Sequence, residues 1–262
     1  MTSPAIFPFG LPSTPRPPRR PRDRAAAFVL GVYPSALHVR WSRARGAFVE
    51  ALAVDDEPTV FWTGEDGPER VAAWGERVGW RDEWGSIASP GTNGSSGRIV
   101  RDEILAPLGI AIEDAWLTDC VDTYFVKDGP SSQQRAIDTR YAPFAKERGL
   151  PAATLPPRPA PRELVRIATR DHAARLRAEL LESAAPLVIT LGNEALAVLR
   201  AIANHEGIPA KLDPAPAAYG REGRVQIEDH TARVIPCIHP GQHADVWTRA
   251  HTAWKTRIPP AP

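Results

Sequence analysis

Four short apolar segments stand out along the chain, and each is followed by polar residues or glycine. They cover residues 25–32, 115–118, 187–191 and 234–238. Apolar residues follow one another in these segments without alternation, which is typical of strands buried on both faces of a parallel sheet. We therefore predict four strands at the centre of the fold.

Segments with helical spacing lie between these strands. Leucine, isoleucine and alanine recur every three or four positions over residues 98–108, 162–182 and 193–203. Asn193 follows Gly192 and is a plausible N-cap for the last of these helices. Strands that alternate with helices predict an α/β fold, here a three-layer α/β/α sandwich with a central four-stranded, mainly parallel sheet.

Two regions depart from this pattern. Residues 1–24 are rich in proline and arginine, and since proline fixes φ and removes a donor, we expect a disordered arm there, with a single domain over residues 25–262. The arm is either a solvated tail or a segment that holds DNA phosphates by charge. Five tryptophans lie between residues 41 and 84, where an insertion could shape an unusual pocket.

Composition limits the possible functions. The 262 residues carry 32 basic and 31 acidic side chains, so only a local basic face would favour a nucleic-acid partner. Two cysteines, Cys120 and Cys237, are too few for a disulfide scaffold or a four-cysteine metal site. The chain shows no secretory signal and no apolar run of the ~18 residues that a membrane span needs. We expect a cytoplasmic protein without a membrane partner.

The residues that follow the four predicted strands are the candidates for chemistry, because ligands of open α/β sheets bind beyond the carboxyl ends of the strands. These residues are Tyr33-Pro34-Ser35, Thr118-Asp119-Cys120, Gly192-Asn193 and His239-Pro240-Gly241. None of these groups alone is specific to one protein family, whereas their order and spacing together are.

This combination resembles the uracil-DNA glycosylase superfamily, of which the chain would be a divergent bacterial member. The family has a Gly-x-x-Pro motif after its first strand, a Thr-Asn element after the second, a Leu-Gly turn after the third and a His-Pro-Ser loop after the fourth. The matching residues are Gly31 to Ser35, Thr118-Asp119, Leu191-Gly192 and His239-Pro240-Gly241, and residues 92–97 look like the family's Gly/Ser-rich loop. The resemblance covers residues 25–257 in short motifs.

The resemblance implies a monomeric, monofunctional DNA glycosylase that needs no cofactor and no metal. The enzyme would flip a base out of single- or double-stranded DNA and hydrolyse its N-glycosidic bond, leaving an abasic site. His239 matches the family's donor to the base oxygen, which stabilises the charge of the leaving base. Many members position the attacking water with a polar residue of the first motif, but here Val32 and Tyr33 stand there.

The residue that positions the water must therefore come from elsewhere. Asn93, His38 and Asp119 are the candidates. Alternatively, the chain has lost hydrolysis and is a catalytically inactive DNA-binding protein of the same fold.

Asp119 stands where uracil-reading members have asparagine. An ionised aspartate only accepts hydrogen bonds, and carboxylates pair with the exocyclic amine of cytosine. This favours a modified cytosine-like base, for example in invading phage DNA, over uracil. Two alternatives remain: a conventional uracil-excising repair enzyme, and an Asp119 that caps the following turn without meeting the base.

The remaining candidates contact the base or the DNA backbone. Tyr33 and Trp84 are expected to stack on the flipped base, with His38 beside it. Backbone contacts are expected from Ser35, Ser95, Ser96, Gly241, Gln242 and His243, the last two at the place of the family's wedge. His239 and His243 have helical metal-ligand spacing, but the intervening Pro240 and Gly241 argue against a helix and hence against a metal site. An unrelated nucleotide-binding enzyme is disfavoured because no Gly-x-Gly-x-x-Gly or Walker-type loop is present.

Overall fold

The computed structural model describes residues 4–43, 48–129, 133–215, 217–242 and 244–258. The strands in this part of the chain are β1 (Ala27–Gly31), β2 (Ala36–Ser42), β3 (Phe48–Asp56), β4 (Ser86–Ala88), β5 (Ala115–Asp119), β6 (Leu187–Leu191), β7 (Asn204–Glu206), β8 (Gly223–Ile227) and β9 (His230–Cys237). The α-helices are α1 (Gly67–Arg77), α2 (Ser95–Ile99), α3 (Gln133–Ala136), α4 (Ala142–Arg148), α5 (Pro161–Ile167), α6 (Ala173–Ser183), α7 (Asn193–Ile202) and α8 (Asp245–Lys255). Helical turns extend α2 to Leu108 and join α5 to α6.

The central sheet has the strand order β5-β1-β6-β9-β8-β7. The first four strands are parallel to one another and coincide with the four predicted strands. Two antiparallel strands, β8 and β7, extend the sheet at one edge, so the prediction of four strands is corrected to six. These two were missed because β8 alternates between buried and exposed residues and β7 is exposed throughout, so neither forms an apolar run.

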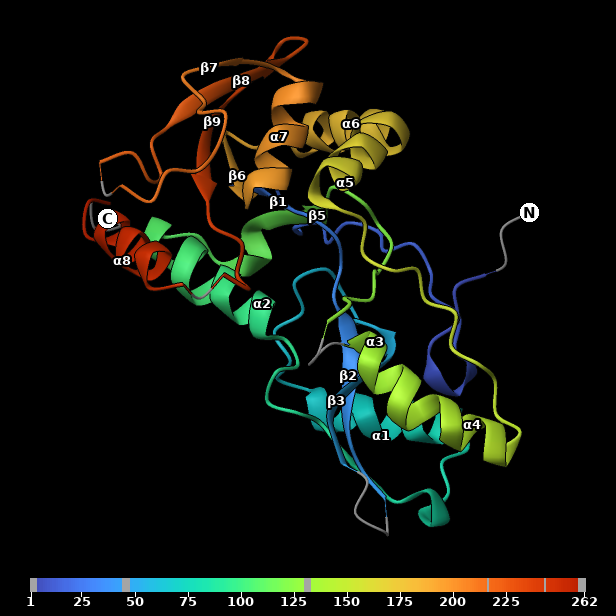
Figure 1. Cartoon of the computed structure of the whole chain (residues 1–262). Coiled ribbons are helices and arrows are strands. Elements are labelled where there is room, and N and C mark those ends of the chain that lie inside the picture. The colour runs from blue at the N-terminus through green and yellow to red at the C-terminus, as the bar shows by residue number, and fades with distance from the viewer. Residues whose placement is uncertain (1–3, 44–47, 130–132, 216, 243, 259–262) are drawn as a thin grey trace.

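Helices cover both faces of this sheet, as Figure 1 shows. Phe28 and Leu30 of β1 point to one face and pack in a core with residues of α5, α6 and α7. Ala27 and Val29 of the same strand point to the other face, where residues from 100–105 and from α8 complete a second core. Strands buried on both faces explain why the predicted segments carry no polar alternation.

The tryptophan-rich insertion forms a separate three-stranded antiparallel sheet, in the order β3-β2-β4. Trp41, Trp74 and Trp84 are buried in a third core between this sheet and helices α1 and α4. The insertion matters for the site because β2 leaves the Gly31 to Ser35 loop directly and β3 returns the chain to the same region.

The N-terminal segment is not a disordered arm over residues 4–24. Phe7 and Phe9 are buried in the third core, and the Phe9 ring lies 4.9 Å from that of Tyr141, centroid to centroid. Further along, Arg19 exchanges two backbone hydrogen bonds of 2.9 Å with Leu117 on the edge strand β5. The prediction of a disordered arm rested on the prolines and arginines alone. The burial of the two phenylalanines holds the segment against the rest of the protein.

No helix in the described part of the chain is long and apolar enough to cross a membrane.

Candidate functional site

A cavity of about 280 Å³ lies beyond the carboxyl ends of β1, β5 and β9. Its lining residues are Tyr33, Pro34, Ser35, His38, Glu57, Phe61, Ser96, Asp119, Tyr124, Phe125, Lys127, Gln133 and His239. The chain runs from β1 to β5 on one side and later to β6 on the other, and open α/β sheets bind ligands at such a switch point. The loops after the first, second and fourth predicted strands thus meet at one cavity.

Gly31 allows this close meeting. A Cβ atom at this position would lie 2.1 Å from Oδ1 of Asp119 and 2.6 Å from Cζ of Phe61. No side chain larger than hydrogen fits without moving both residues. The glycine of the first motif therefore sets how closely the aspartate and the aromatic ring approach.

Asp119 is buried at the cavity wall, and its carboxyl has no hydrogen-bond partner among the described residues. The turn that follows is held by backbone hydrogen bonds, from Cys120 N–H to Gly31 O and from Val121 N–H to Val32 O. Burial raises the pKa of Asp119 to about 8, against the positive charge of Arg175, which lowers it. At neutral pH this carboxyl is therefore mostly protonated.

Glu57 supplies a second buried carboxyl, which the sequence reasoning missed. It directly follows β3, and its Oε1 accepts a hydrogen bond of 3.1 Å from the Ser35 N–H. Burial raises the pKa of Glu57 to about 8, and the nearby charge of Asp119 adds to this shift. The acidic run Asp55-Asp56-Glu57 in the tryptophan-rich insertion was the available signal, but nothing in the sequence places it beside the first motif.

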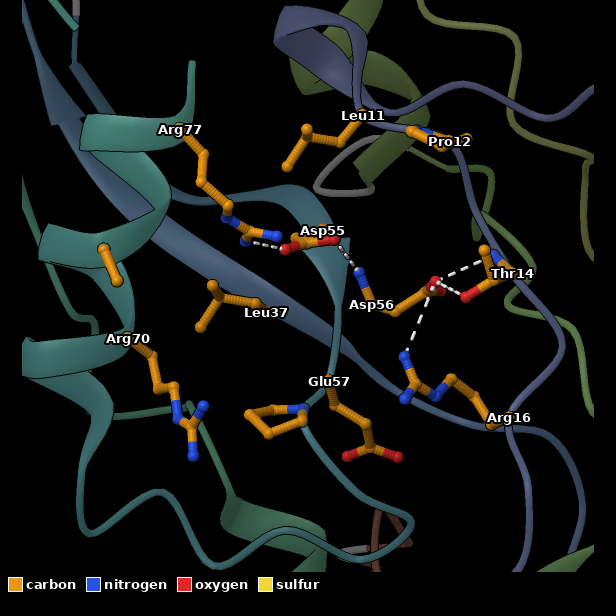
Figure 2. Close-up of a pocket in the computed structure, with 12 residues that line it drawn as sticks. Leu11, Pro12, Thr14, Arg16, Leu37, Asp55, Asp56, Glu57, Arg70 and Arg77 are labelled. Carbon is orange, nitrogen blue, oxygen red and sulfur yellow. Dashed lines mark hydrogen bonds and ion pairs between the residues drawn. The ribbon is translucent and has the colours of Figure 1, made fainter. Parts of the chain in front are cut away.

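Glu57 also lines a second cavity, of about 450 Å³, on its other side (Figure 2). The polar side chains in the walls of that cavity pair with one another: Arg77 pairs with Asp55, and Asp56 accepts hydrogen bonds from Thr14. Glu57 therefore lines two cavities, of which the smaller has the aromatic walls.

His239 contributes a neutral imidazole. Its Nδ1 accepts a hydrogen bond of 3.0 Å from the Gly241 N–H, so in the neutral ring the proton resides on Nε2. Burial, together with the positive charges of Lys127 and Arg158, lowers the pKa of His239 to about 4. The ring is therefore a hydrogen-bond donor without a net charge at neutral pH.

Aromatic rings and cations complete the cavity. The Tyr33 ring lies edge-on to Phe125 with centroids 5.7 Å apart, and the Arg158 guanidinium stands 5.5 Å from the Tyr33 ring centroid. Phe61, which lines the cavity, has a φ of 52°, a left-handed backbone conformation that is rare for a residue with a side chain. Lys127 is exposed at the lining.

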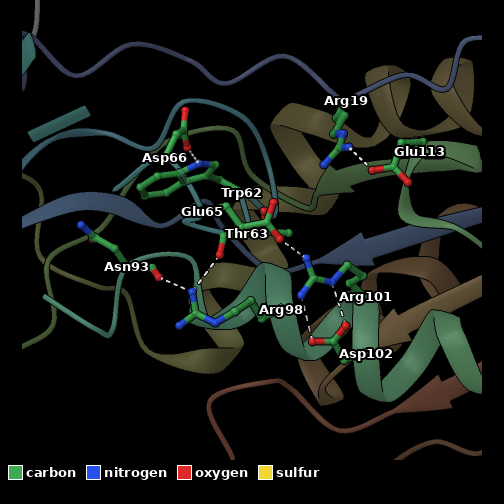
Figure 3. Close-up of polar contacts among 10 residues, drawn as sticks. All are labelled: Arg19, Trp62, Thr63, Glu65, Asp66, Asn93, Arg98, Arg101, Asp102 and Glu113. Atoms are coloured by element: carbon green, nitrogen blue, oxygen red, sulfur yellow. Dashed lines mark hydrogen bonds and ion pairs between the residues drawn. The ribbon is translucent and has the colours of Figure 1, made fainter. Parts of the chain in front are cut away.

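Arg98 anchors the Gly/Ser-rich loop against the segment that carries Phe61. Its Nη1 donates to the carbonyl oxygens of Thr63 and Asn93, each at 2.7 Å, as Figure 3 shows. Gly97 approaches this segment so closely that a Cβ would lie 2.3 Å from the Phe61 carbonyl oxygen. This contact brings Ser96 to the cavity wall.

Asn93 lies outside the cavity lining, although it was a candidate for positioning water. Its amide accepts the His38 N–H at 3.0 Å and donates to the His38 carbonyl at 2.9 Å and to Ser89 Oγ at 3.0 Å. The side chain thus holds the start of β2. His38 does line the cavity, and burial lowers its pKa to about 4.

Trp84 is also placed away from the cavity, in the third core, where its ring lies 5.5 Å from that of Trp80. Ser35 lines the cavity, whereas Ser95 is exposed outside its lining. Gly241 and Gln242 are exposed after the His239 turn. His243 lies outside the described residues.

In the part of the chain that the structure describes, no three His, Cys, Asp or Glu side chains are arranged to hold a metal ion. In comparisons with known proteins, no protein-family model and no curated protein matches the chain.

Proposed function

We propose that this chain is a monofunctional DNA glycosylase that takes a flipped pyrimidine into the 280 Å³ cavity and hydrolyses its N-glycosidic bond. One observation carries the proposal: two buried carboxyls and a neutral histidine donor, from three separate segments, line one cavity with aromatic walls. The strand-end motifs that resemble the uracil-DNA glycosylase superfamily support the same function.

Glu57 and Asp119 suit the roles of base and acid. The charge of Asp119 raises the pKa of Glu57, and near pH 8, where both pKa values lie, one carboxyl can hold a proton while the other has lost its own. In that state one member accepts a proton and the other donates one. A pKa near the working pH favours both transfers.

The proposed reaction is hydrolysis of the N-glycosidic bond by water. A water oxygen attacks C1′ of the sugar while Glu57 accepts the water's proton. The C1′–N1 bond breaks and its electron pair passes to the base, which receives a proton at N3 from Asp119. His239 Nε2–H donates a hydrogen bond to the O2 oxygen of the base, where negative charge develops. The second cavity, which Glu57 also lines, supports the role of this residue as a route for water to its carboxyl.

The proton on Asp119 changes which bases this carboxyl can pair with. A protonated carboxyl presents one acceptor and one donor, which fit the N4 amine and N3 of cytosine. The same two groups also fit N3–H and O4 of uracil, so the protonated carboxyl does not exclude uracil as an ionised one would. We favour a cytosine-type base because its N3 has a lone pair that can take the proton. A modified cytosine in phage DNA is the substrate class that we propose.

Cations at the cavity support DNA as the partner. Lys127 lines the cavity and is exposed, and Arg158 lies over Tyr33. A nucleotide whose base enters the cavity would bring its phosphates near such cations, which bind the backbone without regard to sequence.

Duplex and single-stranded oligonucleotides that contain uracil, cytosine or 5-substituted cytosines test the proposal. We expect abasic sites, seen as alkali-labile breaks, with a cytosine-type base as the best substrate. Glu57→Gln should lower the single-turnover rate by about 100-fold. Glu69→Gln, a change of an exposed acid on α1, is the matched control and should keep the wild-type rate.

Two results would contradict the proposal. DNA binding without any abasic sites would show a catalytically inactive DNA-binding protein. Preferred excision of uracil would leave the glycosylase function in place and overturn the substrate class.

A further inference from the structure

One guanidinium holds three consecutive residues at the carboxyl end of β5. Arg175, in the first turn of α6, donates from Nη2 to the carbonyl oxygens of Asp119 at 2.9 Å and Cys120 at 3.1 Å. Its Nη1 donates to Thr118 Oγ1 at 3.2 Å and to Glu179 Oε1 at 2.8 Å. The backbone of the strand that presents Asp119 to the cavity is thereby tied to a helix on one face of the sheet.

Stability alone explains this arrangement poorly. Glu179 is buried, and both Glu179 Oε2 and Arg175 Nε lack a hydrogen-bond partner among the residues that the structure describes. A buried ion pair stabilises a protein only when its geometry and its remaining hydrogen bonds are good, and apolar replacements are often as stable or more so. A pair that leaves two buried polar atoms unpaired therefore suggests a role in placing charge and backbone.

We infer that Arg175 is a positioning residue for Asp119: it fixes the carboxyl end of β5 and keeps a positive charge beside the Asp119 carboxyl. The catalytic consequence rests on the proposed glycosylase function. The electrostatic consequence does not, because it can be measured on the protein without substrate.

Several charged and titratable groups face Asp119. Arg175 and Glu179 come from α6, Glu57 follows β3, Tyr33 follows β1, Cys120 is its chain neighbour, and His38, Lys127 and His239 line the same cavity. Arg175 lowers the pKa of Asp119, whereas Glu179 raises it. Without Arg175, Asp119 would hold its proton to higher pH, and the carboxyl pair would shift its working range upwards.

Three variants separate charge from geometry. Glu179→Gln removes the acid and keeps the arginine, and adding Arg175→Met to it removes the cation without leaving an unpaired buried glutamate. The step from the first to the second removes the charge of Arg175 together with its hydrogen bonds, and comparison with Arg175→Lys separates the two. Arg175→Lys keeps the charge, but a single ammonium cannot reproduce the fork between two carbonyl oxygens. Arg170→Lys, on an exposed arginine before α6, is the control.

The first measurement follows the carboxyl carbons of ¹³C-labelled aspartates by NMR across a pH titration, with Asp119→Asn to assign the resonance. We expect the Asp119 midpoint in Arg175→Met/Glu179→Gln to lie at least about one pH unit above that in Glu179→Gln, roughly a tenfold tighter hold on the proton. In Arg175→Lys the midpoint should stay close to the wild-type value.

The second measurement is the single-turnover rate of base release as a function of pH. At each pH it also gives the substrate concentration at which this rate is half-maximal. We expect Arg175→Lys to lower the maximal rate by about 100-fold while that concentration changes little, because the carboxyl is misplaced and base binding is retained. In Arg175→Met/Glu179→Gln the pH profile should also move upwards relative to Glu179→Gln.

Coincident Asp119 midpoints in Glu179→Gln and Arg175→Met/Glu179→Gln would overturn the charge role. A wild-type rate in Arg175→Lys would overturn the positioning role, and this variant decides that point even if the double variant fails to fold. A wild-type protein that releases no base would overturn the proposed function, and the titration would still decide the effect of Arg175 on Asp119.

Discussion

Replacing Glu57 by glutamine should change how the stability of the protein depends on pH. The pKa of Glu57 rises from an ordinary 4.5 to about 8 in the folded chain, and that of Asp119 from 3.8 to about 8. Between the ordinary and the raised pKa, the folded protein binds more protons than the unfolded chain. The free energy of unfolding therefore falls as pH rises through this window and is highest below it.

The expected change in the free energy of unfolding follows from the width of the pH range between the ordinary and the raised pKa values. Each carboxyl contributes a slope of about −1.4 kcal/mol per pH unit, which fades as the pH reaches its raised pKa. The histidines work in the opposite sense, because burial lowers the pKa of His38 and His239 to about 4 and their effect ends near their ordinary 6.5. Between about pH 6.5 and 8, each carboxyl should therefore lower the free energy of unfolding of the wild-type protein by about 2 kcal/mol.

Urea unfolding followed by tryptophan fluorescence measures this slope. Glu57→Gln should lose about half of the pH-dependent change in this range, because glutamine cannot ionise, and should gain stability over the wild type as pH rises. Glu69→Gln, which changes an exposed acid, should keep the wild-type slope. An unaltered slope in Glu57→Gln would refute the assignment of Glu57 as a buried carboxyl that keeps its proton at neutral pH.

Five further changes test other parts of the site and fold. His239→Ala should lower single-turnover base release by tens-fold or more, because the donor to the base oxygen is lost, and near-normal kinetics would remove His239 from the mechanism. Lys127→Ala and Arg158→Ala should each weaken binding to DNA of any sequence and reduce the salt slope of binding by about one, and an unchanged slope would show that the cation meets no phosphate. Gly31→Ala should abolish base release and leave a folded protein with an altered cavity, since its Cβ would meet Asp119 and Phe61; full activity with an intact circular dichroism spectrum would contradict this packing. Phe9→Ala should destabilise the protein by about 3–5 kcal/mol in urea unfolding, whereas a loss near zero would show that the N-terminal segment is not part of the core.

Local pattern was sufficient for the centre of the fold. The four parallel strands are buried on both faces, so their apolar runs are visible in the sequence without knowledge of their partners. Parallel strands also bring their carboxyl ends to one edge, which is why Tyr33, Asp119 and His239 could be grouped before their positions were known. Strands β7 and β8 lack such a run and were missed for the same physical reason.

Two candidates that were chosen by residue type lie outside the cavity lining, because residue type does not say what a side chain contacts. The Asn93 amide makes its hydrogen bonds to the backbone of His38, and the Trp84 ring packs among aromatic rings in the third core. Phe61 took the place at the cavity wall that we had expected of a tryptophan.

The sequence by itself determined the parallel α/β core, the loops at its carboxyl edge and the presence there of an aspartate and a histidine. Only the tertiary structure decided that Glu57 joins them, since this residue follows a strand of another sheet and is brought in by the return of β3 to the Ser35 loop. It also decided the charge states, because burial depends on segments far apart along the chain. Burial keeps the proton on Asp119 and removes it from His239, and neither state can be read from the residue alone.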